Sequence, residues 1–218
     1  MKTARLPAII RTLLFSFSFP LLLNADSWMA VEIQTFSSKD KDFIFVVVPA
    51  SYPDPKYPSA KTDPEIQRLL SQNKTCVGSL MKYFEQSKSY LPIWTRPLSN
   101  IVSPVSAMIS DDGKYVVTTG EWYGGGHAAI AICIYNSTGK LIRSLTATDI
   151  LGEERINYVP ASSTITFWGK VKEIDTKRGE LVIEEWKSGS GLPDDPNIFR
   201  ERRIKLIDGS FIDGSDGK

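Results

Sequence analysis

The sequence predicts a mainly β protein in which antiparallel hairpins form meandering, blade-like sheets accompanied by one or two short helices. From residue 76 onward, short runs of apolar and polar residues alternate, as in strands that bury one face. Turn signals separate many of these runs, since each has an Asp or Asn able to cap its own turn and a Gly able to adopt positive φ. Such turns are typical of tight hairpins and occur at 111–114, 136–140, 175–180 and 208–210.

Two strands are expected ahead of this region, at 28–36 and 42–48. The first alternates around Val31, Ile33 and Thr35, whereas the second is apolar on both faces, as in a strand covered on both sides. The remaining strands are expected within the runs 76–85, 90–98, 104–110, 114–122, 128–135, 140–147, 163–174, 180–187, 202–208 and 210–213.

The clearest helix signal lies at 63–73. Asp63 and Pro64 suit the cap and first turn of a helix, and the apolar residues of 66–70 fall on one face. This helix is expected to pack against a sheet. A second short helix is expected over 150–155, with Thr148 or Asp149 as its cap.

The first residues show the succession of regions that is typical of a secretory signal peptide. Lys2 and Arg5 form a basic start, residues 6–23 are mostly apolar, and small residues follow. We therefore expect a signal peptide at 1–25, with cleavage near 25–27. The expected location of the mature protein is secreted or periplasmic.

The alternative to cleavage is a retained membrane anchor. Arg11 and Pro20 interrupt the apolar run, leaving it shorter than the roughly 20 residues that a spanning helix needs. We therefore expect no transmembrane segment in the mature chain. The rest is expected to be a single β-rich domain at 28–212, with a proline-rich surface loop at 49–64 and a frayed C-terminal tail at 213–218.

Charge argues against a nucleic-acid partner. Removing the signal peptide changes the formal net charge from +1 to about −2, whereas nucleic-acid surfaces need clustered positive charge. The only dense basic group is 199–205, which is interpreted as the solvated face of a strand; an anion site is the alternative. We expect no cofactor and no metal site, since two cysteines and one histidine show no zinc-type spacing.

The two cysteines leave two alternatives open. In an oxidising compartment Cys76 and Cys133 could form a disulfide, but the sequence alone does not show whether they lie within bridging distance. The other interpretation is that both are buried thiols within strands.

The segment 118–133 contains the sole histidine and three consecutive glycines. A phosphate-binding loop would lead into a helix, whereas the residues after Gly126 alternate as a strand does, so a nucleotide site is disfavoured. The segment is interpreted as a connection between two strands. Its exposed aromatic and polar side chains nevertheless give a candidate binding surface formed by Trp122, Tyr123 and His127.

No arrangement of acids and nucleophiles supports a catalytic assignment. Glu184 and Glu185 are adjacent in a strand and therefore point to opposite faces, so they cannot serve as the paired carboxylates of a glycosidase. No nucleophile-elbow motif accompanies His127. We assign no catalytic residue.

A family resemblance lies within 104–151. The element SDDGKYVV at 110–117 resembles the strand-turn-strand of blades in WD-repeat-like β-propeller proteins. The longer run, with TCVGSL at 75–80, resembles a group of uncharacterised secreted bacterial proteins in which a signal peptide precedes one β-rich domain. The resemblance implies a blade-like sheet, with a propeller-like arrangement as one alternative, and it implies no activity.

Taken together, these features predict a non-catalytic binding or interaction module of unknown partner, with protein and glycan as the candidate ligands. An extracytoplasmic hydrolase and a structural envelope component are the alternatives.

Overall fold

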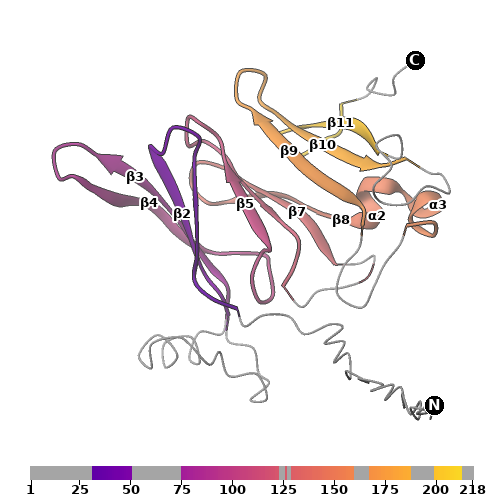
Figure 1. Cartoon of the computed structure of the whole chain (residues 1–218), viewed down its shortest axis with the longest axis horizontal. Helices are drawn as coiled ribbons and strands as arrows, with labels where there is room; N and C mark the ends of the chain where they lie inside the picture. The colour runs from indigo at the N-terminus through magenta and orange to yellow at the C-terminus, as the bar shows by residue number, and fades with distance from the viewer. Residues whose placement is uncertain are drawn as a thin grey trace, which may run out of the picture.

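A computed structural model describes residues 31–50, 75–122, 126, 129–159, 167–187 and 199–212 (Figure 1). Several expectations lie outside these residues. They are the signal peptide at 1–25, most of the proline-rich segment 49–64, the helix at 63–73, the start of the strand at 163–174, and the tail at 213–218.

The described chain is mainly β and forms three antiparallel sheets, which confirms the expected fold class. Within each sheet, every strand pairs only with strands next to it in sequence, as in a meander. The first sheet contains β1 (Gln34–Ser37), β2 (Phe43–Val48), β3 (Val77–Phe84) and β4 (Ser89–Pro97). The second contains β5 (Ser106–Ile109), β6 (Val116–Thr119), β7 (Ile130–Tyr135) and β8 (Leu141–Thr146). The third contains β9 (Gly169–Asp175), β10 (Glu180–Trp186) and β11 (Phe199–Lys205).

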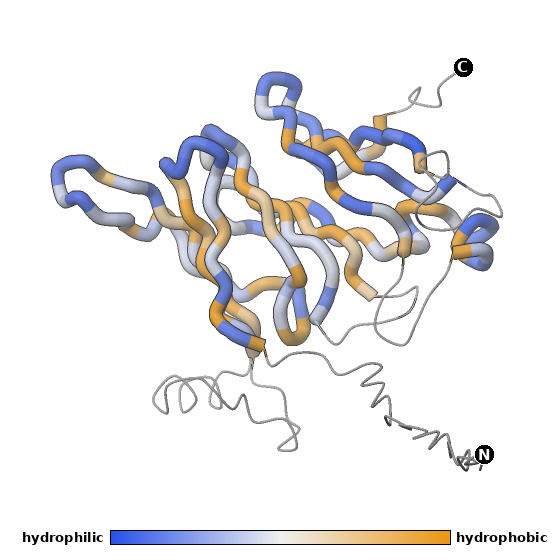
Figure 2. Tube along the Cα trace, viewed as in Figure 1, coloured by the Kyte–Doolittle hydropathy of each residue, from blue (hydrophilic) through white to orange (hydrophobic). Residues whose placement is uncertain are grey.

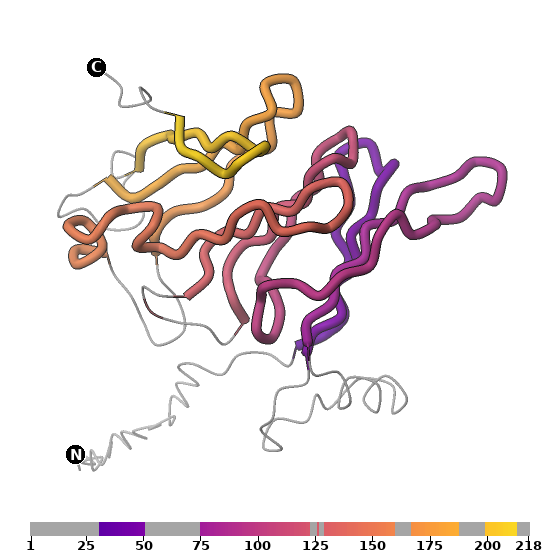
Figure 3. The backbone as a smooth tube through the Cα atoms, turned by 180° about the vertical axis from the view of Figure 1, so that it is seen from behind, coloured from indigo at the N-terminus to yellow at the C-terminus, as the bar shows by residue number. Residues whose placement is uncertain are grey.

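The three sheets lie side by side in chain order. The second sheet lies between the first and the third in opposite views of the molecule (Figures 1 and 3). Strand β5, the first of its sheet, contacts β1 of the first sheet and β9 of the third. The opening strands of successive sheets are therefore neighbours.

Two apolar cores hold the sheets together. One joins the first and second sheets around Phe45, Leu80 and Tyr135, and the other joins the second and third sheets around Ile132 and Ile183. Hydrophilic residues concentrate in the hairpin ends, while apolar residues recur along the strands that cover these cores (Figure 2). Since each sheet buries at least one face, the period-two pattern of the sequence has a direct structural cause.

Asp and Asn side chains close the hairpins as the sequence predicts. Asp112 accepts a hydrogen bond from the Lys114 N–H at 3.1 Å, and Gly113 has a φ of +68°. Equivalent side-chain acceptors in the other three expected turns are Asn136, Asp175 and Asp208.

The turn between β1 and β2 repeats the turn between β5 and β6. Ser110 receives the Tyr115 N–H on its hydroxyl and donates to Asp112. In the turn between β1 and β2, Ser38 accepts the Phe43 N–H on its hydroxyl and donates to Asp40 in the same way. Lys41, with a φ of +66°, stands where the later turn has Gly113. The first hairpins of the two sheets are therefore the same structural unit.

Two short helices, α2 (Ala147–Leu151) and α3 (Glu153–Ile156), follow β8. The expected cap is wrong by two or three residues, because Thr146 caps α2 and Asp149 is the third helical residue that completes a reciprocal capping box. Gly152, with a φ of +82°, separates the two helices. No helix in the described part of the chain is long and apolar enough to cross a membrane.

Candidate functional site

Of the three residues in the expected binding surface, only Trp122 belongs to the described chain. It is half-buried, and its backbone N–H donates to the backbone carbonyl of Ser103 at 2.7 Å. Ser103 lies in the segment 98–105, which joins the first sheet to the second and is called the link below. Trp122 is therefore fixed against the link. Tyr123 and His127 lie outside the described residues, and the surface they were expected to form with Trp122 stays a prediction.

A buried carboxylate next to Trp122 organises this region. Glu121 Oε1 accepts the Val102 N–H at 2.9 Å, and Oε2 accepts the Ile101 N–H and Asn100 Nδ2, each at 3.0 Å. Asn100 also donates to the Gly120 carbonyl at 2.9 Å. Consecutive backbone N–H groups of the link thus bind the Glu121 carboxylate, as such groups bind anions in other proteins.

Two exposed apolar side chains lie in the link that Glu121 anchors. Ile101 is 77% exposed, and its N–H donates to Glu121. Val105 is exposed as well, and its N–H donates to the carbonyl of Thr119 at 2.9 Å. The backbone beneath Ile101, Val105 and Trp122 is therefore rigidly hydrogen-bonded. We call these three residues the link surface.

The two cysteines are free, buried thiols in this structure, as in the second of the two alternatives. Burial raises the pKa of Cys76 to about 12, with the charge of Glu121 adding to the effect. Burial also raises the pKa of Cys133, although a hydrogen bond with Ser144 opposes it. Because the thiolate is the reactive form, neither side chain is prepared for nucleophilic chemistry.

A second buried carboxylate lies in the third sheet, at the end next to the helices. Glu185 has no exposed surface and binds three arginines. Its Oε1 accepts from Arg155 Nη1 at 2.9 Å and Arg200 Nε at 2.6 Å, and its Oε2 accepts from Arg202 Nη1 at 3.1 Å. We call these four residues the arginine cluster. It ties α3, β10 and β11 together.

The opposite face of this sheet has a ladder of partly exposed ion pairs. Glu184 pairs with Lys170 at 3.0 Å, while Arg203 pairs with Glu180 at 2.9 Å. Lys172 joins the two halves by pairing with both Glu184 and Glu201. The expectation that Glu184 and Glu185 point to opposite faces is confirmed by these separate partners.

The interpretation of 199–205 as a solvated face does not hold for two of its five charged residues, Arg200 and Arg202. Glu201 and Arg203 belong to the exposed ladder, whereas Arg200 and Arg202 turn toward the buried Glu185. Alternation along β11 separates the two sets, because successive side chains point to opposite faces. Glu185 shares a strand face with the apolar Leu181 and Ile183, and this is the signal that could have predicted inward arginines.

Comparison with models of protein families gives no match, and comparison with curated proteins likewise gives none. In the part of the chain that the structure describes, no three His, Cys, Asp or Glu side chains gather as metal ligands would. The site therefore has to be interpreted from its own geometry.

Proposed function

We propose that the protein is a non-catalytic binding module that acts outside the cytoplasm, in a secreted or periplasmic location. The observation that carries this proposal is that the two buried carboxylates of the described chain, Glu121 and Glu185, hold structural elements together. Glu121 is occupied by backbone N–H groups and Asn100, and Glu185 by guanidinium groups. A general acid or base has to reach a substrate proton, which these enclosed carboxylates do not do.

The proposed contact region is the link surface. Ile101 and Val105 expose apolar area beside a tryptophan, and such patches with rigid backbones suit recognition of a protein or glycan. Glu121 pre-organises the link before any partner arrives, which reduces the entropy lost on binding. Tyr123 and His127 would extend this surface along the chain.

The proposed location and architecture rest on further features. The basic and apolar N-terminal sequence supports export. The contacts of β5 with both β1 and β9, and the repeated first hairpin, support the proposal that the sheets are propeller-like blades.

Two equally exposed isoleucines allow a matched test of the binding surface. A glycan array and a displayed peptide library would be screened with the wild-type protein, then with Ile101→Ser, Trp122→Ala and Ile207→Ser. Ile207 is 74% exposed but lies in the turn after β11. We expect the hits to weaken at least tenfold in Ile101→Ser and Trp122→Ala and to persist in Ile207→Ser.

Two results would overturn the proposal. One is retention of all hits in both link-surface variants. The other is turnover of generic esterase, glycosidase or peptidase substrates that disappears in Glu121→Gln, because it would make Glu121 a catalytic group.

A further inference from the structure

The arginine cluster contains more positive than negative charge. In the exposed ladder on the other face of the sheet, three basic side chains meet three carboxylates. In the cluster, Arg155 and Arg202 both pair with Glu185, the one carboxylate that either of them meets among the described residues. Arg200 also pairs with Glu185 and makes further contacts of its own. Arg155 and Arg202 still share one carboxylate charge, so one positive charge is in surplus.

Both of these arginines are held in fixed positions. Arg155 Nε donates to the Leu151 carbonyl at 2.7 Å, and its Nη1 also reaches the Trp186 carbonyl at 3.3 Å. Arg202 Nη1 donates to the Ile150 carbonyl at 2.8 Å, and its guanidinium lies 3.7 Å from the centre of the Phe211 ring. These contacts remove rotamer freedom before a ligand binds.

Donors remain on both guanidinium groups. Arg155 uses Nε and Nη1, and Arg202 uses Nη1, so within the described residues Arg155 Nη2 and Arg202 Nε and Nη2 have no acceptor. The two side chains are 23% and 24% exposed, so an ion from solvent can reach them. Guanidinium groups with free N–H donors are well matched to carboxylate and phosphate oxygens.

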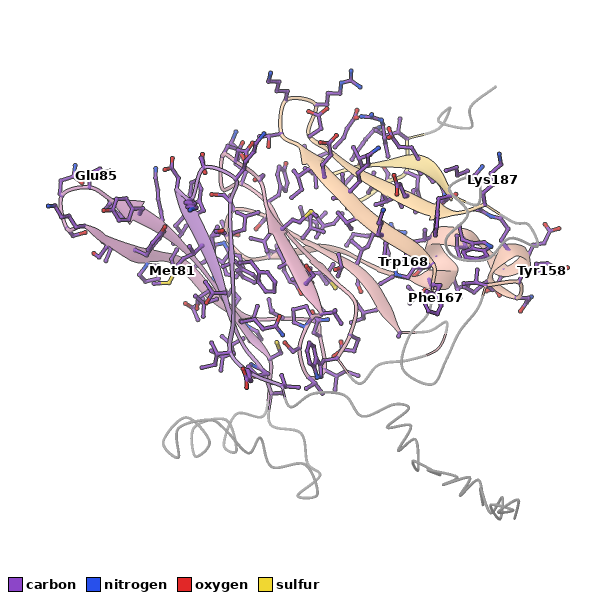
Figure 4. The ribbon with its side chains drawn as sticks, in the orientation of Figure 1. Met81, Glu85, Tyr158, Phe167, Trp168 and Lys187 are labelled. Atoms are coloured by element: carbon purple, nitrogen blue, oxygen red, sulfur yellow. The ribbon has the colours of Figure 1, made fainter. Side chains whose placement is uncertain are left out.

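The surface next to the cluster is suited to a ligand larger than an ion. The rings of Tyr158 and Phe167 are exposed, and Tyr158 lies three residues after Arg155. Lys187 is exposed as well and lies two residues after Glu185. All three lie at the helical end of the third sheet (Figure 4). Exposed rings beside positive charge provide both apolar contact and electrostatic attraction.

We propose that Arg155 and Arg202 form a binding site for an oxyanion, a carboxylate or phosphate group, with Glu185 as the positioning residue that holds both guanidinium groups. This site is separate from the link surface, since it is built from α3, β10 and β11. Neither proposal depends on the other.

The test uses the full chain labelled with ¹⁵N and follows the arginine Nε–Hε signals by NMR. Sodium phosphate and, separately, sodium acetate are titrated against sodium chloride at matched ionic strength. We expect saturable shifts of the Arg155 and Arg202 signals. Saturation by phosphate alone assigns a tetrahedral oxyanion, and saturation by acetate assigns a carboxylate; either result supports the site.

Matched variants separate this site from general electrostatic attraction. Arg155→Lys and Arg202→Lys keep the charge but lose the planar fork, and each should weaken binding at least tenfold. Arg203→Lys, on the exposed face of the same strand, should leave binding unchanged, as should Trp122→Ala. Equal weakening by Arg203→Lys would overturn the proposal. So would the absence of saturation in the wild-type protein, which decides the matter even if a cluster variant does not fold.

Discussion

A Cβ atom placed on Gly139 would lie 2.6 Å from Cε3 of Trp94, so the turn between β7 and β8 closes directly on an indole of the first sheet. Gly113 approaches Phe43 in the same manner. The β5–β6 and β7–β8 turns of the second sheet therefore both end against aromatic rings of the first. The absence of a side chain is part of the packing between the two sheets.

Gly139→Ala should destabilise the protein by more than Gly179→Ala does. Both glycines have positive φ, which costs a residue with a side chain roughly 1–2 kcal/mol. Gly179 has open space around it, whereas the new methyl group at Gly139 would also overpack Trp94, adding about 1–3 kcal/mol. Urea denaturation of the two variants measures the difference. Equal losses would show that the indole moves away without cost.

Glu185→Gln should cost about 3–5 kcal/mol of unfolding free energy, because it leaves guanidinium groups facing each other without their buried counter-charge. Glu184→Gln is the control from the next position of the same strand. Its partners are exposed lysines, so a loss below about 1 kcal/mol is expected. Chemical denaturation gives both values. A similar small loss in both variants would mean that Glu185 contributes no more than a surface ion pair.

The Cys76 thiol should make the protein sensitive to alkaline pH. Burial raises its folded pKa to about 12 from an ordinary value of 9.0, so the folded state retains a proton that the unfolded chain releases. This contribution to stability is complete below about pH 9 and is lost as the pH rises toward about 12. Urea denaturation across this range should therefore show a steeper loss for the wild-type protein than for Cys76→Ala.

Thiol labelling is the control for that interpretation. Iodoacetamide at mildly alkaline pH should react slowly with the native protein. After unfolding without reductant, it should react readily with both Cys76 and Cys133. Labelling measured by mass spectrometry distinguishes the alternatives. Rapid labelling of the native state would contradict burial, and failure to label the unfolded chain would show a disulfide.

The strands and most turns could be predicted because both depend on local chemistry. Alternation fixes which side chains share a face, and Asp or Asn before glycine fixes a tight turn. The turn containing Lys41 lacked the glycine on which such predictions depend, although Ser38 and Asp40 repeat the roles of Ser110 and Asp112. A comparison of hydroxyl and carboxylate positions, rather than glycines, would have found the repeat.

The site was harder to predict because its partners come from distant elements. Alternation correctly separated Glu184 from Glu185, but it could not show that Arg155 from α3 and Arg202 from β11 converge on Glu185. Glu121 was only one of several acids near the glycine-rich segment. Its role depends on the backbone of Ile101 and Val102, which sequence patterns do not locate in space.

The pairing of strands only with their sequence neighbours has a consequence for how the chain folds. The first sheet ends at Pro97, before the second begins at Ser106, and the second ends before the third begins at Gly169. No pairing within a sheet spans an intervening strand, so each loop that must close is a single connection between consecutive strands. During synthesis, each sheet can complete as soon as its last strand has emerged, and the next can then nucleate on the finished surface.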